Sequence, residues 1–111
     1  MKERFPMDDN QPFSMLNALW FKPDGGAEKY KEYQAAAHPF AEKYGATASD
    51  AFVPVQSLIG EFDADLMFFI HWPDFETFQK FLADPGYQAI QPLREEAITK
   101  SLLIRCNKVQ P

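Results

Sequence analysis

The chain has 111 residues, a net charge of −5 and a hydrophobic content of 46%, which is typical of one globular domain rather than of a disordered chain. With no basic stripe and no apolar run near the roughly 20 residues of a membrane span, neither nucleic acid nor a membrane is expected as a partner. The single cysteine, Cys106, excludes an internal disulfide and a cysteine zinc site, and the polar start does not match a signal peptide, so we expect a cytoplasmic protein.

The amino-terminal part predicts a leader followed by the first strand of a single domain. Residues 1–13 show neither a helical nor a strand period, so we expect a flexible leader or short arm there and one α/β domain over 14–109. The apolar run from Ser14 to Phe21 predicts a strand. Turn-forming residues at 22–26 end this strand and begin a helix, with Asp24 as the expected cap.

A helix and a second strand are predicted next. From residue 27 to residue 44 apolar side chains recur every three or four positions, which indicates an amphipathic helix that ends at Gly45. Pro39 lies inside this pattern, so we expect the helix to bend or to divide there. Residues 51–59 are rich in strand-forming side chains, and because Pro54 cannot donate to a ladder, they predict an edge strand or a bulge.

The second half of the chain predicts a central strand, helices and a closing strand. Asp74 is placed to cap the helix that follows the central strand, and the turn at 84–86 interrupts the helical pattern. The predicted elements are a strand at 66–72, a helix from 75 to 82, a helical stretch from 87 to 99 that bends at Pro92, and a strand at 101–109.

The resulting order of elements is βαββαβ. This order is typical of a ferredoxin-like protomer of the α+β class, in which one antiparallel four-stranded sheet carries its helices on one face. A sheet covered on one face should alternate apolar and polar residues, but the first and third predicted strands are apolar on both faces. The helices can cover only one of these faces, so we expect a second copy to cover the other, as a homodimer.

Arg94 is the most informative candidate functional residue. It falls within the apolar arc of the last predicted helix, where a buried guanidinium needs a partner. One interpretation is structural: Arg94 covers apolar surface and pairs with an acid such as Asp84 or Glu61. The other is functional: Arg94 anchors a carboxylate or enolate in a pocket between helix and sheet. The aromatic residues that could line such a pocket, unless they are simply core, are Tyr30, Tyr33 and Trp20.

The remaining chemistry-bearing residues suggest no metal centre and no catalytic motif. The two histidines, His38 and His71, lie on different predicted elements and lack the spacing of a metal site. Cys106 alternates with apolar residues on the last strand, which favours a small buried hydrophobe over a nucleophile. No acid/base pair and no glycine-rich phosphate loop is recognisable. We therefore expect neither a metal nor a cofactor.

Several segments resemble a known family. These are Tyr30 and Tyr33 on the first predicted helix, Trp72-Pro73 after the third strand and, most specifically, the stretch from Asp84-Pro85-Gly86-Tyr87 to Pro92-Leu93-Arg94. They resemble the family filed as domain of unknown function 1330, within the dimeric α/β-barrel superfamily. The resemblance implies a ferredoxin-like protomer and a homodimeric barrel but brings no established reaction. The wider superfamily includes cofactor-free oxygenases, haem-degrading enzymes, isomerases and ligand-sensing domains.

The sequence thus leaves its function open between two main hypotheses. The first is a homodimeric protein that binds a small apolar or aromatic molecule in a pocket between sheet and helices. The alternative is a cofactor-independent enzyme of the monooxygenase or isomerase type that acts on a phenolic or enolisable substrate. A purely structural role is the third hypothesis. The candidate ligand-binding residues are Arg94, His71, His38, Tyr30, Tyr33 and Trp20.

Overall fold

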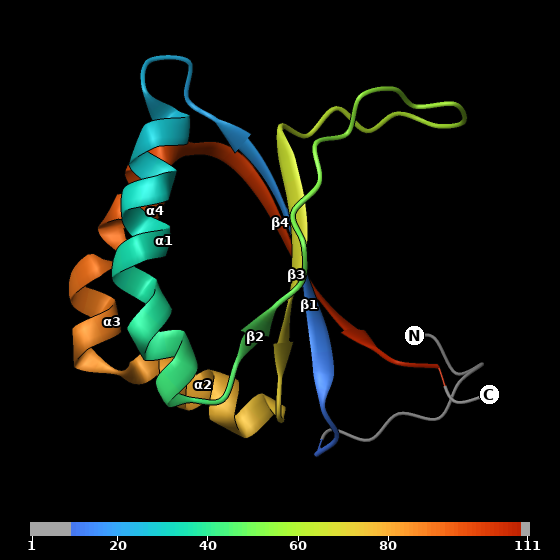
Figure 1. Ribbon diagram of the computed structural model, residues 1–111. Coiled ribbons are helices and arrows are strands. Elements are labelled where there is room, and N and C mark those ends of the chain that lie inside the picture. The colour runs from blue at the N-terminus through green and yellow to red at the C-terminus, as the bar shows by residue number, and fades with distance from the viewer. Residues whose placement is uncertain (1–9, 110–111) are drawn as a thin grey trace.

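The computed structural model describes residues 10–109. Figure 1 shows a twisted sheet with the helices gathered on one side of it. Most of the predicted leader at 1–13 lies outside the described residues, but Phe13 already belongs to the first strand and is buried. The elements are β1 Phe13–Phe21, α1 Gly26–Lys43, β2 Thr47–Ala48, β3 Leu66–Trp72, α2 Phe75–Ala83, α3 Pro85–Ile90, α4 Pro92–Ala97 and β4 Ile98–Asn107.

The sheet has the topology that the element order predicts. Its four strands follow the order β2-β3-β1-β4, and each neighbouring pair is antiparallel. The strand β1 is central and pairs with both β3 and β4. The ferredoxin-like, α+β fold is therefore confirmed, with the helices on one face of the sheet (Figure 1).

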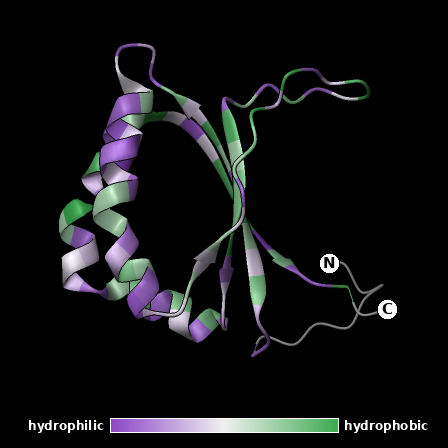
Figure 2. Cartoon of the chain, viewed as in Figure 1, coloured by the Kyte–Doolittle hydropathy of each residue, from purple (hydrophilic) through white to green (hydrophobic). Residues whose placement is uncertain are grey.

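The core lies between the sheet and the helices. From β1, Phe13, Met15 and Leu19 are buried on the helix-facing side, and the register places Trp72 opposite Phe13 on the same side. Aromatic rings from the helices complete this layer: the ring of Phe81 lies 4.8 Å from that of Trp72, measured between centroids. Figure 2 shows the corresponding pattern, with largely hydrophobic strands beside helices that carry both hydrophobic and hydrophilic residues.

The opposite side of the sheet carries no helix (Figure 1). We call it the outer face. Its side chains are mostly apolar, and several of them are only partly buried because no helix of residues 10–109 covers them. The strand register places on this face Ser14, Leu16, Ala18, Trp20, Met67, Phe69, His71, Lys100, Leu102, Ile104 and Cys106.

The start of α1 differs from the prediction. Its N-cap is Gly25, with φ of 81°, and no side chain caps the helix, so the expected cap at Asp24 is wrong. The reason is a close approach: a Cβ on Gly26 would lie 2.6 Å from the backbone oxygen of Ala97, to which the Lys22 amide also donates at 2.9 Å. Two successive glycines let the chain turn tightly against the end of α4. The Asp74 cap of α2 is confirmed, since its carboxylate accepts from the Thr77 amide at 2.7 Å.

The helix α1 runs through Pro39 without dividing. The division that was one expectation at this residue is therefore wrong, while the bend that was the other stays a prediction. Pro39 lies on the exposed side of the helix, whereas Tyr30, Tyr33 and Ala37 on its other side are buried. Ala37 before the proline and Phe40 and Ala41 after it pack in or against the core, which holds the helix together despite the missing backbone donor.

The expected strand at 51–59 does not form. Only Thr47–Ala48 pairs with β3 as a strand, and Phe52 adds one isolated bridge to Met67. Beyond this bridge the chain leaves the sheet on its helix-free side as an exposed loop, residues 53–62, which we call the arm (Figure 1). Pro54 offers no donor to extend the ladder, which explains why pairing stops near it.

The carboxy-terminal helices are more divided than expected. The stretch predicted from 87 to 99 forms two short helices, α3 and α4, which meet at Gln91 just before Pro92. The strand β4 then begins at Ile98 rather than at residue 101. These short helices bring Tyr87 and Arg94 over the sheet, where they help to define the site described next.

Candidate functional site

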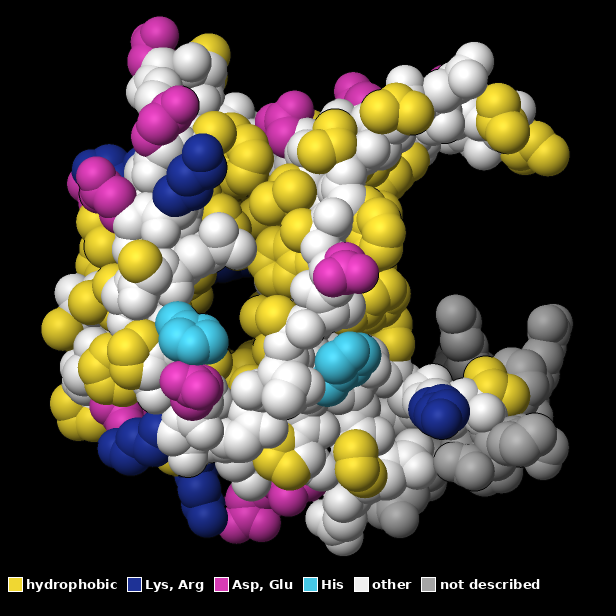
Figure 3. All heavy atoms as spheres, viewed as in Figure 1, with side chains coloured by type: hydrophobic (Ala, Val, Ile, Leu, Met, Phe, Trp, Pro, Cys, Tyr) yellow, Lys and Arg dark blue, Asp and Glu magenta, His cyan; other side chains and the backbone are white. Residues whose placement is uncertain are grey.

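A cavity of about 540 Å³ lies between the helix layer and the helix-facing side of the sheet. This volume is in the range of ligand pockets, about 300–1,000 Å³. Figure 3 shows the hollow between the two layers. Most of its wall is apolar or aromatic, with contributions from Met15, Ala37, Phe68, Ile70, Trp72, Phe78, Phe81 and Leu103.

The guanidinium of Arg94 reaches this cavity from α4. Its Nη2 atom is buried, and no atom of residues 10–109 forms a hydrogen bond with it. The acidic partners considered from the sequence are engaged elsewhere: Asp84 accepts from Lys43 Nζ at 3.0 Å and from Tyr44 Oη at 2.7 Å, and Glu61 belongs to the arm. The predicted pairing of Arg94 with either acid is therefore wrong, and no acidic side chain of residues 10–109 forms an ion pair with it.

Two tyrosines of α1 and one of α3 place hydroxyl groups near this charge. Tyr33 and Tyr87 share a hydrogen bond of 2.7 Å between their hydroxyl oxygens, and Tyr30 packs against Tyr33. Burial raises the pKa of both Tyr30 and Tyr33, and the nearby positive charge of Arg94 opposes this rise. Both hydroxyls are therefore neutral at neutral pH. Because one proton suffices for the Tyr33–Tyr87 bond, the pair retains a second O–H that can donate to a ligand.

Asn17 adds a polar group to the sheet side of the cavity, and the sequence analysis missed it. Its side chain is buried, lines the cavity and donates to the Met15 carbonyl at 3.2 Å. The signal was present, since Asn17 is the one polar residue in the otherwise apolar series Phe13, Met15, Leu19 and Phe21 on one side of the first strand. A buried amide in such a series points to a polar function on that side.

His38 lies at the rim rather than inside. The imidazole is exposed on α1 and its Nε2 atom lies 3.2 Å from Glu42 Oε2. Both residues line the cavity together with the exposed residues Thr47 and Ala48 of β2, so its opening lies between α1 and the β2 edge.

Two of the six predicted site residues lie elsewhere. His71 and Trp20 project from the outer face, because alternation along the strands puts them on the opposite side from Met15 and Phe68. His71 Nδ1 lies 2.8 Å from Ser14 Oγ, and Trp20 Nε1 donates to Asp63 Oδ1 at 2.9 Å. Their inclusion in one pocket with Arg94 is wrong. The structure does bring Arg94, Tyr30, Tyr33 and His38 together.

The chemistry available inside the cavity is recognition of an anionic oxygen by neutral donors and one cation. Among residues 10–109, no carboxylate forms an ion pair with Arg94, and the acid that lines the cavity, Glu42, lies at the rim beside the imidazole of His38. Among residues 10–109, no group of three or more His, Cys, Asp or Glu side chains is placed to hold a metal ion. Over the same residues, no helix has the length and apolar character to cross a membrane.

Comparison with solved structures finds the same fold in uncharacterised proteins. A protein of unknown function from Rhodopseudomonas palustris is 28% identical, with a TM-score of 0.83 over 92% of this chain and 85% of that chain. A NIPSNAP domain protein from Burkholderia xenovorans is 16% identical, with a TM-score of 0.62 over 89% and 95%. A dimeric protein of ferredoxin-like fold from Bacteroides fragilis is 9% identical, with a TM-score of 0.59 over 87% and 96%.

The comparison with family models is more specific than the comparison with solved structures. No curated protein matches the chain. The model of the family described as Domain of unknown function (DUF1330) matches residues 25–105, a span that contains α1, the arm and Arg94. Because this match covers well over half of the sequence, the chain belongs to the DUF1330 family.

Proposed function

We propose that the cavity binds a small molecule that combines an aromatic or alicyclic body with one carboxylate or phenolate group. The observation that carries this proposal is the buried Nη2 atom of Arg94, which has no hydrogen-bond partner among residues 10–109. A buried cation without a partner is costly, and an anionic ligand would supply the missing acceptor.

The surrounding groups support one orientation of such a ligand. Its anionic oxygens face Arg94 and the neutral hydroxyls of Tyr30 and the Tyr33–Tyr87 pair. Its ring faces the apolar wall, where Trp72 and Phe81 offer aromatic surfaces. An apolar wall with a few convergent polar groups is the usual architecture of a small-molecule site.

Calorimetric titration with cinnamate, and with the neutral cinnamamide as its matched probe, tests this proposal. We expect heat of binding from the acid and none from the amide. Arg94→Gln should abolish the signal while the protein stays folded. Lys31→Gln, which removes an exposed charge from α1, should leave binding unchanged. Equal binding of acid and amide, or full binding by Arg94→Gln, would contradict the role of the charge.

A catalytic use of the same groups is the second candidate. A cation beside neutral hydroxyl donors can stabilise the negative charge that develops on an enolate or phenolate oxygen. This arrangement supports a cofactor-independent isomerase or monooxygenase. Turnover of a bound phenolic or quinol probe, followed by oxygen uptake and mass spectrometry, distinguishes the enzyme from a binding protein. A probe recovered unchanged favours binding alone.

We also propose that the protein acts as a homodimer that pairs through the outer face. This face exposes Ile104 to 44% and leaves Leu16 and Phe69 only partly buried. Contiguous apolar surface of this kind marks an interaction site, and the neighbour of the same fold from Bacteroides fragilis is described as dimeric. Light scattering should give twice the chain mass of 12.8 kDa; a monomer at micromolar concentration would reject the dimer.

A further inference from the structure

Among the residues that the structure describes, the large apolar side chains with the highest exposed fractions lie in the arm. Val55 is 91% exposed, Leu58 84% and Ile59 98%. Figure 3 shows hydrophobic side chains along this projection and along the helix-free side of the sheet. The segment from 49 to 65 that contains the arm forms no helix or strand. Connections of this length without secondary structure are uncommon in compact domains and are either functional loops or linker segments.

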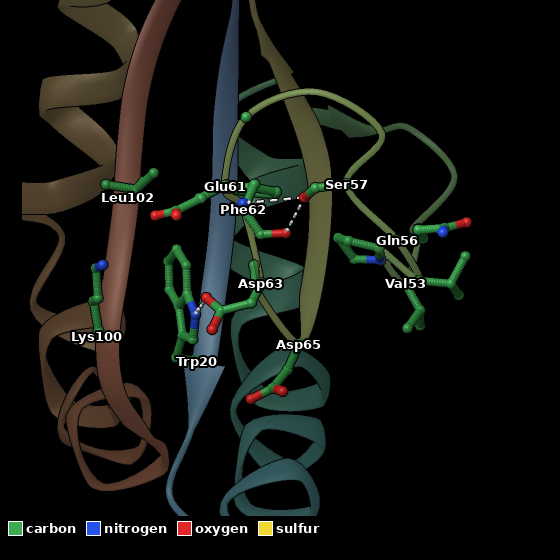
Figure 4. Close-up of a pocket in the computed structure, with 14 residues that line it drawn as sticks. Trp20, Val53, Gln56, Ser57, Glu61, Phe62, Asp63, Asp65, Lys100 and Leu102 are labelled. Atoms are coloured by element: carbon green, nitrogen blue, oxygen red, sulfur yellow. Dashed lines mark hydrogen bonds between the residues drawn. The ribbon is translucent and has the colours of Figure 1, made fainter.

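Contacts at the base of the arm hold it away from its own core. Trp20 Nε1 donates to Asp63 Oδ1 at 2.9 Å, and the Phe21 amide donates to Asp65 Oδ2 at 2.8 Å. The rings of Trp20 and Phe62 meet edge to face at 5.8 Å. Ser57 Oγ accepts from the Phe62 amide at 3.2 Å and donates to its carbonyl at 3.1 Å, which ties the two sides of the arm together (Figure 4). These bonds set the direction of the arm rather than folding it onto the sheet.

The arm and the outer face are complementary in charge as well as in polarity. The arm contains one acid, Glu61, and no basic residue, while Asp63 and Asp65 at its base are bonded to Trp20 and the Phe21 amide of their own chain. The outer face contains no acid, and its permanently charged side chain is Lys100. An apolar projection with one negative charge and an apolar face with one positive charge therefore lie on the same side of one chain.

We propose that the arm of each copy packs on the outer face of a second copy, in a reciprocal two-fold exchange. This inference rests on the proposed dimer, and it adds that the arm is the segment that crosses the dimer interface. A two-fold interface needs two mutually complementary surfaces on each chain, and the arm and the outer face meet that requirement. The cleft of about 840 Å³ between them, lined by Trp20, Val53, Val55 and Leu102, is where the partner's side chains would enter.

A crosslinking experiment on the full chain tests the exchange. A benzophenone amino acid replaces Ile59, and protein labelled with heavy nitrogen is unfolded, mixed with equal unlabelled protein, refolded together and irradiated. We expect crosslinks from position 59 to outer-face peptides of β1, β3 or β4, with mixed isotope pairs that show contact between two chains. The same probe in place of Gln79, which is exposed on α2, should give no outer-face crosslinks.

A second measurement weighs the contribution of the arm to assembly. Leu58→Asp with Ile59→Asp should raise the dissociation constant of the dimer about a hundredfold, since two buried aliphatic side chains are each worth about one factor of ten or more. Gln79→Asp is the matched control and should leave the constant unchanged. If a dimer forms but gives only same-isotope crosslinks, and the double variant leaves its dissociation constant unchanged, the proposed exchange is wrong. The proposed dimer would still stand. A wild-type monomer overturns both, while binding of cinnamate remains a separate result.

Discussion

The two faces of this sheet are built from the same strands with comparable apolar content, yet they differ in what covers them. On the helix-facing side, Phe13, Met15 and Leu19 are 3%, 4% and 0% exposed. On the outer face, their neighbours include Leu16, which is partly buried, and Ile104, which is 44% exposed. The covered face is also incompletely filled, because a cavity with an unpaired cation lies beneath the helices. Apolar character alone therefore does not say which face becomes core and which becomes an interface.

Substitutions on the two sides of the sheet break this comparison most strongly. Leu19 is 0% exposed on the helix-facing side and lies outside the cavity wall, so Leu19→Glu buries an unpaired charge and should cost more than about 4 kcal/mol, enough to unfold the protein. Phe69→Glu places the same charge on the outer face, where it should dissociate the dimer and leave the helices folded. Circular dichroism and sedimentation velocity measure the two effects. Equal unfolding by both variants would contradict the distinction between the faces.

The second prediction concerns acid sensitivity within the helix layer. Hydrogen bonds from Tyr44 and Lys43 lower the pKa of Asp84 to about 2. Because the folded pKa lies below the unfolded value of about 3.9, the stabilisation is complete above that value and is lost as the pH falls from about 4 toward 2. Asp84→Asn should lower the urea midpoint at pH 7 and flatten its decline over that interval.

Asp24→Asn is the matched control, since this exposed residue caps no helix. Its urea midpoint should follow the wild type at every pH. A decline in Asp84→Asn as steep as that of the wild type would show that other carboxylates dominate acid unfolding; Asp74, whose pKa is also lowered by its bond from the Thr77 amide, is the first to test.

The third prediction sharpens the description of the cavity. Tyr33→Phe removes one partner of the hydroxyl pair and leaves the Tyr87 hydroxyl without it. We expect a loss of about 1 kcal/mol in the free energy of unfolding. Tyr33→Phe with Tyr87→Phe should lose less than the sum of the two single variants, because no hydroxyl is left unpaired. Additive losses in urea titrations would show that the two groups do not interact.

The smallest effect on stability is expected at Arg94. Its buried Nη2 atom has no partner among the described residues, so Arg94→Met breaks no hydrogen bond at that atom and should leave the free energy of unfolding unchanged or raise it by about 1 kcal/mol. Binding of cinnamate should nevertheless disappear. Thermal unfolding and calorimetry of the same sample measure both. A large destabilisation would instead assign Arg94 a structural role.

The candidate site was predictable only in part. The helical period brought Tyr30 and Tyr33 to one side of α1, and the position of Arg94 within an apolar arc marked it as unusual. Strand alternation also separated Trp20 from Met15 and Leu19, but it did not say on which side the helices would lie. This is why Trp20 and His71 were grouped with residues from which the sheet separates them.

The sequence by itself determined the features that depend on neighbouring residues: the apolar runs of β1 and β3, the face of α1, the Asp74 cap and the βαββαβ order. Only the tertiary structure decided those that depend on distant segments. In the folded chain, Asp84 accepts hydrogen bonds from Lys43 and Tyr44 and none from Arg94. The close approach of α1 to Ala97 leaves room only for a glycine at position 26. The segment at 51–59 contributes an exposed arm instead of the predicted strand. Local patterns encode propensity and periodicity, whereas the partner of a charge or a strand depends on which remote group the fold brings within bonding distance.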